Sequence, residues 1–337
     1  MVIVATISPE QSHRGADISH TYKISPAPNA VSNKKNYLST QKLNCTSLFC
    51  QRGSSQTSRS SQKMENKVAA AFPDNAVIHL NTIQKISQET RLYVIFIIAR
   101  SGSTWLMEMA QNSNILGTPQ EWFNEGWIHT CELALGCRPP LAIGTGDVDE
   151  YLQRTVADYR SQSGVMGLQL SPYQTECLCS MLERPRDICS LVQPFYLRRR
   201  NLVAQAISLY RSVRSEFFHS YQANPVLQSR LDAVEYDTEA IVGWCEHLVA
   251  GEVFFESTFS RLNLSPARFT YEDIIAGPED VLTWMNKTIN PTSTTRVAAH
   301  SKNLQTLRTE ISEEWCHRFR TERADYLAQL ESRRPAF

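Results

Sequence analysis

An uninterrupted apolar run over residues 93–99 leads directly into the short polar loop Arg100-Ser-Gly-Ser-Thr104. The run predicts a strand buried on both faces, because a half-buried strand alternates apolar and polar residues. Gly102 allows a tight turn, and the apolar spacing that resumes at Trp105 predicts a helix. This order of elements indicates an anion site, since the first N–H groups of a helix lack partners within it and lie at the positive end of its dipole.

The loop differs from the phosphate-binding loop of nucleoside triphosphatases. That loop reads G-x-x-x-x-G-K-[ST], whereas here the loop is shorter and Arg100 precedes the glycine. The difference argues against hydrolysis of nucleoside triphosphates. For this segment taken alone, a strand-to-helix turn that binds no ligand is the alternative interpretation.

A second cationic segment, Arg198-Arg199-Arg200, lies immediately before a predicted helix over residues 201–218. Apolar residues recur there at helical spacing, and Asn201 is suited to the N-cap. Ser208 lies about two turns into this helix, which would let its hydroxyl and an arginine guanidinium bind one phosphate. A solvated or salt-bridged surface is the alternative interpretation of the arginine triplet.

From residue 92 the chain alternates between predicted strands and helices. Further strands are predicted at residues 164–170, 191–197 and 267–271, and further helices from Glu121, within 147–161, over 238–262 and over 278–288. Pro194 weakens the strand at 191–197, because proline cannot donate to a strand ladder. The alternation predicts a three-layer α/β fold, with a parallel central sheet and helices on both faces. Both cationic segments then follow strand carboxyl ends, where open parallel sheets bind ligands.

Composition limits the classes of protein that fit. The chain has 337 residues, and no apolar stretch approaches the roughly 20 residues of a membrane span, so we expect a soluble, cytoplasmic protein. Residues 64–337 hold 26 Lys and Arg against 32 Asp and Glu, which offers no basic footprint for nucleic acid. The nine cysteines are scattered without C-x-x-C pairs, which indicates reduced thiols rather than a zinc or redox site.

Residues 1–75 differ in composition from the rest. They are rich in Ser, Thr, Asn, Gln and Lys and lack strand or helix periodicity, which predicts a disordered extension ahead of one domain over residues 90–333. Their Ser-rich, acid-poor character partly resembles an organellar transit peptide, although the apolar core of a secretory signal is missing. Met64 offers an alternative start close to the expected domain.

Four segments in a fixed order carry a resemblance to a known family. Residues 100–106 match R-S-G-S-T-x-L, and residues 117–123 match G-x-P-x-E-[FWY]-F. Residues 199–208 match R-x-D-x-x-x-Q-A-V-S with Asn201 in place of Asp, and residues 312–320 resemble S-D-E-W-x-x-x-[FY]-R. Over residues 92 to about 325, the chain resembles the bacterial trehalose 2-sulfotransferase-like (Stf0-type) family, which takes sulfate from 3'-phosphoadenylyl sulfate (PAPS).

The resemblance implies a P-loop nucleoside-kinase-like fold and a role for each motif. Glu121 would be the catalytic base that accepts the acceptor's proton, and Arg100 would steady the developing charge. Arg199 or Arg200, with Ser208, would hold the 3'-phosphate. The residues implied to bind the 5'-phosphosulfate are Arg100, Ser101, Gly102, Ser103 and Thr104. A small-molecule acceptor, adenosine 3',5'-bisphosphate (PAP) as product, a homodimer and no metal complete the expectation.

Residue type alone leaves other interpretations of these positions. Glu121 is alternatively a helix-start carboxylate, and Trp122 and Phe123 are expected in the core. His129 and His219 are alternative bases. A nucleotide-dependent kinase or hydrolase, and a PAPS- or PAP-binding protein without turnover, are the alternative functions.

Some positions depart from the family pattern. Gln169 stands where the family usually has lysine, and residues 214–218 replace a Q-T-G-x-W segment. Arg308 is a candidate substitute for a missing arginine before the fourth motif. These departures point to an acceptor other than trehalose.

Overall fold

The computed structural model describes residues 66–124, 128, 146–301 and 309–337. Within them a central sheet of four parallel strands has the spatial order β2-β1-β3-β4. The strands are β1 (Arg91–Ile97), β2 (Val165–Leu170), β3 (Val192–Arg198) and β4 (Ala267–Thr270). The α/β fold and all four strands predicted from the sequence are confirmed.

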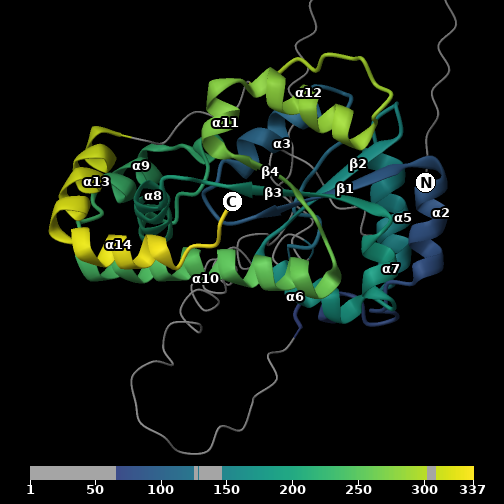
Figure 1. Cartoon of the computed structure of the whole chain (residues 1–337), viewed down its shortest axis with the longest axis horizontal. Coiled ribbons are helices and arrows are strands. Elements are labelled where there is room, and N and C mark those ends of the chain that lie inside the picture. Colours follow the sequence, from purple (N-terminus) through teal and green to yellow (C-terminus); the bar gives the residue numbers. More distant parts are fainter. Residues whose placement is uncertain (1–65, 125–127, 129–145, 302–308) are drawn as a thin grey trace, which may run out of the picture.

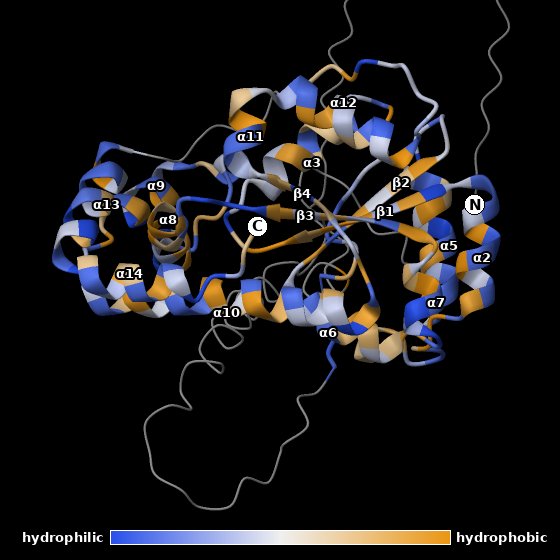
Figure 2. Cartoon of the chain, viewed as in Figure 1, coloured by the Kyte–Doolittle hydropathy of each residue, from blue (hydrophilic) through white to orange (hydrophobic). Residues whose placement is uncertain are grey.

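Helices cover both faces of the sheet (Figure 1). Alternate residues of β1 belong to two different apolar clusters: Leu92, Val94 and Phe96 to one, Tyr93, Ile95 and Ile97 to the other. Successive side chains of a strand point to opposite faces, so each cluster fills the layer between the sheet and one set of helices. Strand β1 is accordingly orange over most of its length in Figure 2. Burial on both faces explains why the sequence of β1 shows no polar alternation.

The two clusters assign the main helices to the two layers. Helices α3 (Ser103–Asn112), α11 (Tyr271–Ala276) and α12 (Pro278–Ile289) contribute to the cluster around Ile95. The other cluster receives α2 (Leu80–Glu89), α5 (Val148–Tyr159), α6 (Pro172–Met181), α7 (Pro185–Cys189), α8 (Leu202–Ser215), α10 (Thr238–Leu262), α13 (Glu310–Glu322) and α14 (Ala324–Ser332). Shorter elements are η1 (Ala69–Ala71), η3 (Ser220–Gln222) and α9 (Pro225–Asp232). No helix among the described residues has the length and apolar character needed to cross a membrane.

Most of the helices predicted from periodicity are present. The predictions within 147–161 and at 201–218, 238–262 and 278–288 correspond to α5, α8, α10 and α12. Helix α8 has the expected N-cap, because Asn201 Oδ1 accepts a hydrogen bond from the Ala204 N–H at 3.0 Å. The helix predicted from Glu121 is wrong at its start, because the chain pairs with β2 at Gln120 and then turns over residues 122–123. Ile128 is helical.

Pro194 lies within β3 although it has no N–H group. Strand β4 pairs with β3 only from Phe195 onward, so β3 is still an edge strand at Pro194. On its other side Pro194 lies opposite Val94 of β1. An edge position is where strands tolerate proline, which reconciles the residue with the predicted strand.

Residues 66–75, which the sequence places in the disordered extension, pack against the domain. Val68 and Phe72 are 0% and 1% exposed, and Asn66 Nδ2 donates to the Cys177 carbonyl at 3.0 Å. The segment is too short for its few apolar residues to show a strand or helix periodicity. Residues 1–65 lie outside the described residues, so the disorder expected for them stays a prediction.

Gly167→Ala is expected to destabilise the sheet. A Cβ on Gly167 in β2 would lie 2.2 Å from Cζ of Tyr93, a fully buried ring whose hydroxyl donates to the Leu116 carbonyl. We expect the free energy of unfolding, measured by urea denaturation, to fall by about 1–3 kcal/mol, as in other overpacked cores.

Gly251→Ala is the matched control for this substitution. A Cβ on Gly251 in α10 would meet no atom nearer than 3.5 Å, so the better helix propensity of alanine should maintain or raise stability. Equal losses in both variants would show that the Tyr93 ring does not require glycine at position 167.

Candidate functional site

The loop between β1 and α3 follows a left-handed path. Arg100 and Gly102 have φ angles of 65° and 85°, and a Cβ on Gly102 would lie 2.4 Å from Cδ2 of Tyr271. Glycine at this position therefore lets the Tyr271 ring close over the loop. Gly102 is also the N-cap of α3 and has no side chain with which to cap its first N–H groups. Those groups are suited to bind an anion.

The two cationic segments predicted from the sequence meet at this loop. Arg100 Nε donates to Ser208 Oγ at 2.9 Å, and Arg100 Nη1 donates to the Phe218 carbonyl at 2.5 Å. Arg199 Nη1 in turn donates to the Arg100 carbonyl at 3.3 Å. The β1–α3 loop, the β3–α8 turn and the second turn of α8 thus form one site at the carboxyl edge of the sheet.

Electrostatics in this site disfavour positive charge. Burial, and secondly the neighbouring charge of Arg199, lower the pKa of Arg100 to about 10. Arg100 therefore stays protonated at neutral pH, and among the described residues no carboxylate forms an ion pair with it. A buried cation whose partners are neutral is stabilised by an incoming anion.

Ser101 gives a second indication of a ligand. The residue is fully buried, and its Oγ has no hydrogen-bond partner among the described residues. A buried hydroxyl without a partner costs roughly 1–3 kcal/mol. A ligand oxygen that paired with Ser101 Oγ would remove that cost, so the loop fits a phosphate or sulfate group.

The three consecutive arginines after β3 have separate surroundings. Arg198 is buried, and its Nε and Nη2 both donate to the carboxylate of Glu252 at 2.9 Å. Arg200 is exposed, and its Nη2 donates to Asp273 Oδ1 at 2.9 Å. The guanidinium of Arg199 lies beside the loop, 4.6 Å from the ring centroid of Tyr271. The alternative interpretation of a salt-bridged surface therefore holds for Arg200, whereas Arg199 lies at the site.

Sequence reasoning missed Tyr271 and Glu272, which follow β4 directly. Tyr271 packs between Gly102 and Arg199. The Glu272 carboxylate accepts hydrogen bonds from the Arg200 and Asn201 N–H groups at 2.9 and 3.2 Å, which fixes the β3–α8 turn. Their position was a usable signal, because residues that follow parallel strands gather at the same edge of the sheet.

Glu121 lies near the carboxyl end of β2 and is half-buried. Its Oε2 accepts hydrogen bonds from Gln174 Nε2 at 2.9 Å and Asn124 Nδ2 at 3.1 Å. Gln174 forms a capping box with Ser171 at the start of α6, the helix that follows β2. The carboxylate is thus oriented by two neutral amides. Its neighbours Trp122 and Phe123 are each 2% exposed, which confirms their expected place in the core.

Gln169 connects β2 to the anion loop. It is 1% exposed, and its Nε2 donates to the Ser103 carbonyl in the first turn of α3 at 2.9 Å. Gln169, where the resemblance leads us to expect lysine, therefore supplies a neutral, structural hydrogen bond at this edge of the sheet.

The fourth motif anchors α13 to α8. Arg211 Nη1 donates to Thr309 Oγ1 at 3.0 Å and to Ser312 Oγ at 2.7 Å, and its guanidinium lies 5.5 Å from the Trp315 ring centroid. This attachment lies one helical turn beyond Ser208. His129 and Arg308, two residues that the sequence singled out, lie outside the described residues.

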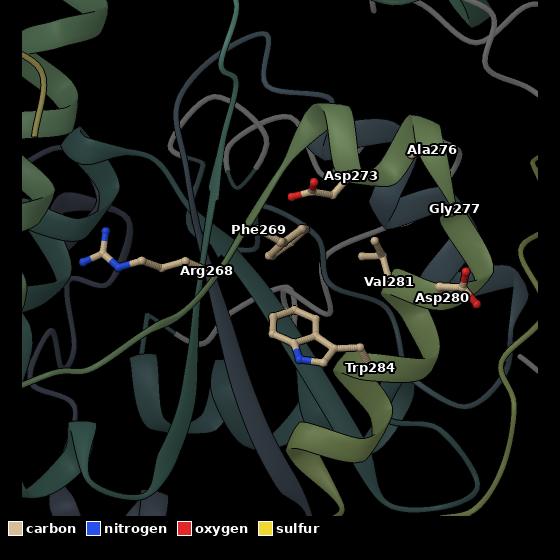
Figure 3. A pocket seen from close by; sticks show the side chains of 8 residues that line it. All are labelled: Arg268, Phe269, Asp273, Ala276, Gly277, Asp280, Val281 and Trp284. Carbon is tan, nitrogen blue, oxygen red and sulfur yellow. The ribbon is translucent and has the colours of Figure 1, made fainter. Parts of the chain in front are cut away.

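A pocket of about 380 Å³ opens on the neighbouring surface of β4, α11 and α12 (Figure 3). Its lining consists of Arg268, Phe269, Asp273, Ala276, Gly277, Asp280, Val281 and Trp284. Asp273 joins this pocket to the arginine cluster through its ion pair with Arg200.

His219, an alternative base in the sequence, is expected to stay neutral in the folded protein. It follows Phe218, the carbonyl partner of Arg100, and its ring stacks on Tyr221 at a centroid distance of 5.2 Å. Burial, and secondly the charge of Arg100, lower the pKa of His219 to about 3. We therefore expect its imidazole resonances in NMR spectra to show no titration between pH 8 and 5.

The same shift makes stability depend on pH. The unfolded chain binds a proton at His219 below its ordinary pKa of 6.5, whereas the folded chain does not, so stability falls as the pH drops from 6.5 toward 3. His219→Gln should flatten that dependence. His79→Gln is the matched control, because Asp149 raises the pKa of His79 and its removal should not flatten the curve. An imidazole titration near pH 6.5 would contradict the assignment.

Comparisons with known proteins agree with the motifs and the geometry. The profile of the Stf0 sulphotransferase family matches residues 92–322, a range that includes both cationic segments and, except for Arg91, the four strands. The chain is also 27% identical over 218 residues to trehalose 2-sulfotransferase of Mycolicibacterium smegmatis, an alignment that covers 55% of this chain and 79% of that relative. The chain belongs to the Stf0 sulphotransferase family.

Proposed function

We propose that this protein transfers a sulfuryl group from PAPS to a hydroxyl or amine of a small-molecule acceptor, such as a saccharide, a glycolipid or a specialised metabolite. The contact between its two cationic segments supports the proposal, with Arg100 bonded to Ser208 and Arg199 bonded to Arg100. PAPS carries anionic groups at both its 5' and 3' positions, and it therefore needs two neighbouring anion sites. A nucleoside triphosphate carries all its phosphates on one side.

In this proposal each segment binds one end of the donor. The α3 amides, Arg100 and the buried Ser101 hydroxyl bind the 5'-phosphosulfate, together with the rest of residues 100–104. Arg199, Arg200 and Ser208 hold the 3'-phosphate. Arg200 reaches it by leaving its exposed ion pair with Asp273, a kind of pair worth about 1 kcal/mol or less.

The chemistry requires one proton to move and one charge to be stabilised. The acceptor oxygen attacks sulfur while the S–O bond to the 5'-phosphate breaks, and PAP leaves with the bond's electron pair. Glu121 accepts the acceptor's proton, and Arg100 with the α3 amides stabilises charge on the departing oxygen. These groups supply the charge stabilisation that the step needs, so the scheme includes no metal.

An assay with isotopically labelled PAPS tests the proposed activity. Incubation with a fractionated extract of the source cells should give a labelled product, identified by mass. Donor binding without consumption would instead support the non-catalytic alternative, and activity that requires a divalent metal with a nucleoside triphosphate would support a kinase or hydrolase. The homodimer and the cytoplasmic location expected from the sequence stay predictions.

Glu121→Gln is expected to lower kcat by about 100-fold or more, because the amide cannot accept a proton. The dissociation constant of PAP, measured by calorimetry, should be nearly unchanged, because the substitution keeps the size and the hydrogen bonds of the side chain. Glu176→Gln is the matched control, since Glu176 is exposed on α6 close to Gln174. If Glu121→Gln lowers the affinity for PAP as much as it lowers kcat, Glu121 is not the base.

Arg199→Ala is expected to raise the dissociation constant of PAP by about tenfold or more, the loss typical of a charged hydrogen-bond partner of phosphate. Arg214→Ala, an exposed position at the end of α8, is the matched control and should bind PAP normally. Arg200→Ala measures whether Arg200 leaves Asp273 for the ligand, in which case its loss should be of similar size. Unchanged PAP titration in Arg199→Ala would remove Arg199 from the site.

A further inference from the structure

Residues 334–337 lie against β3 and the β3–α8 turn, which carries Arg199 and Arg200. After α14 the chain crosses to the middle of the sheet, beside β3 (Figure 1). The Arg334 side chain is 5% exposed, and it donates from Nη2 to the Arg199 carbonyl and from Nη1 to the Arg200 carbonyl, each at 3.0 Å. Arg334 thus binds the backbone of Arg199 and Arg200, the two arginines that the proposed function assigns to the 3'-phosphate.

Buried charge holds Arg334 in this position. The Glu252 carboxylate on α10 is 2% exposed and accepts hydrogen bonds from Arg334 Nε at 3.0 Å and Nη2 at 2.7 Å. The same carboxylate receives Arg198. Two guanidinium groups therefore share one fully buried carboxylate, an arrangement that is strongly destabilised when one member is removed.

The chemistry of the site specifies arginine. A guanidinium has five N–H donors in a rigid plane. In Arg334 all five have partners, because Nε bonds to Glu252, Nη1 bonds to the Arg200 carbonyl and Glu331, and Nη2 bonds to the Arg199 carbonyl and Glu252. Lysine has three donors on a single atom and cannot span this set of acceptors.

Contacts of two residues that follow Arg334, Pro335 and Phe337, also hold the segment in place. The Pro335 carbonyl accepts a hydrogen bond from Arg198 Nη1 at 2.8 Å. The Phe337 ring lies 5.7 Å from the Tyr196 ring and 5.3 Å from the Arg198 guanidinium. Residues 335 and 337 therefore contact the carboxyl end of β3, at Tyr196 and Arg198, where the turn begins.

We propose that Arg334 is a positioning residue for donor binding. By fixing the carbonyls of Arg199 and Arg200, it sets the directions in which their side chains leave the end of β3. The inference rests on the proposed function. It adds a residue outside the range matched by the family profile, which ends at residue 322.

Three variants test this role. Arg334→Gln removes the charge and most of the donors, and Arg334→Lys keeps the charge but loses the planar set of five donors. Arg333→Ala is the matched control, since Arg333 is 56% exposed and pairs with Glu246 at the surface. The readouts are the dissociation constant of PAP, KM and kcat with PAPS, and hydrogen exchange of the peptide covering residues 198–204 in ligand-free protein. All are measured well below the melting temperature of each variant.

We expect Arg334→Gln to raise the dissociation constant of PAP and the KM for PAPS by about tenfold, with a smaller change in kcat. The reason is that Arg199 and Arg200 bind the donor in the proposed function but take no part in the proton transfer. Arg334→Lys should show an intermediate loss, and Arg333→Ala should match the wild type. Exchange at residues 198–204 should accelerate in both Arg334 variants. A merely structural role would lower the melting temperature and leave PAP affinity unchanged in the folded variant.

The exchange measurement separates failure of this inference from failure of the proposed function. If the wild type does not bind PAP, the proposed function fails, and unchanged exchange at residues 198–204 in Arg334→Gln overturns the positioning role as well. If Arg334→Gln does not fold, Arg334→Lys and Phe337→Ala replace it, and wild-type exchange and wild-type PAP affinity in both overturn the inference. Faster exchange with weaker PAP binding supports it.

Discussion

The site depends on two guanidinium groups brought together in a partly desolvated loop. Arg100 and Arg199 repel each other, and burial adds to the cost of their charges. A hydroxyl and a carbonyl accept hydrogen bonds from Arg100, and these neutral partners offset part of the cost without cancelling its charge. The Tyr271 ring lies under the Arg199 guanidinium. Arg198, one residue earlier, is instead neutralised by the buried Glu252. Consecutive arginines thus contact different groups, a buried carboxylate for Arg198 and an aromatic ring for Arg199, and this difference comes from packing rather than from residue type.

The parallel sheet is what places these groups side by side. Each strand ends at the same edge, so the residue that follows each one contributes a different part. The β1 loop supplies the helix amides, β2 leads into the capping box that orients Glu121, β3 supplies the arginines, and β4 supplies the Tyr271 ring. A change at one strand end therefore alters its neighbours. Gly102 illustrates this coupling, because the space for its missing side chain is occupied by Tyr271 from β4.

The sequence predicted the parts of the fold that rest on local patterns. The unbroken apolar run of β1, the periodicity of α8 and α10 and the Asn201 cap are short-range signals, and each is confirmed. The fourth motif and the arginine triplet could be located, but not the separate environments of their members. Those environments come from contacts distant in sequence, such as Arg334 with the Arg199 carbonyl, which no periodicity encodes. The start predicted for the helix at Glu121 is wrong for a similar reason, since pairing of Gln120 with β2 competes with local helix formation.

Charge is distributed unequally over the two halves of the site. The loop and the β3–α8 turn are cationic, whereas two of the groups that contact Glu121 are the amides of Gln174 and Asn124. The buried amide of Gln169 lies between β2 and the loop. A cation beside a carboxylate makes it a weaker base, because the cation stabilises the ionised form. The two amides orient the Glu121 carboxylate and add no positive charge of their own. Gln169 stands at the position where the resemblance leads us to expect lysine, so its neutral amide bonds to the Ser103 carbonyl and adds no positive charge at this edge of the sheet.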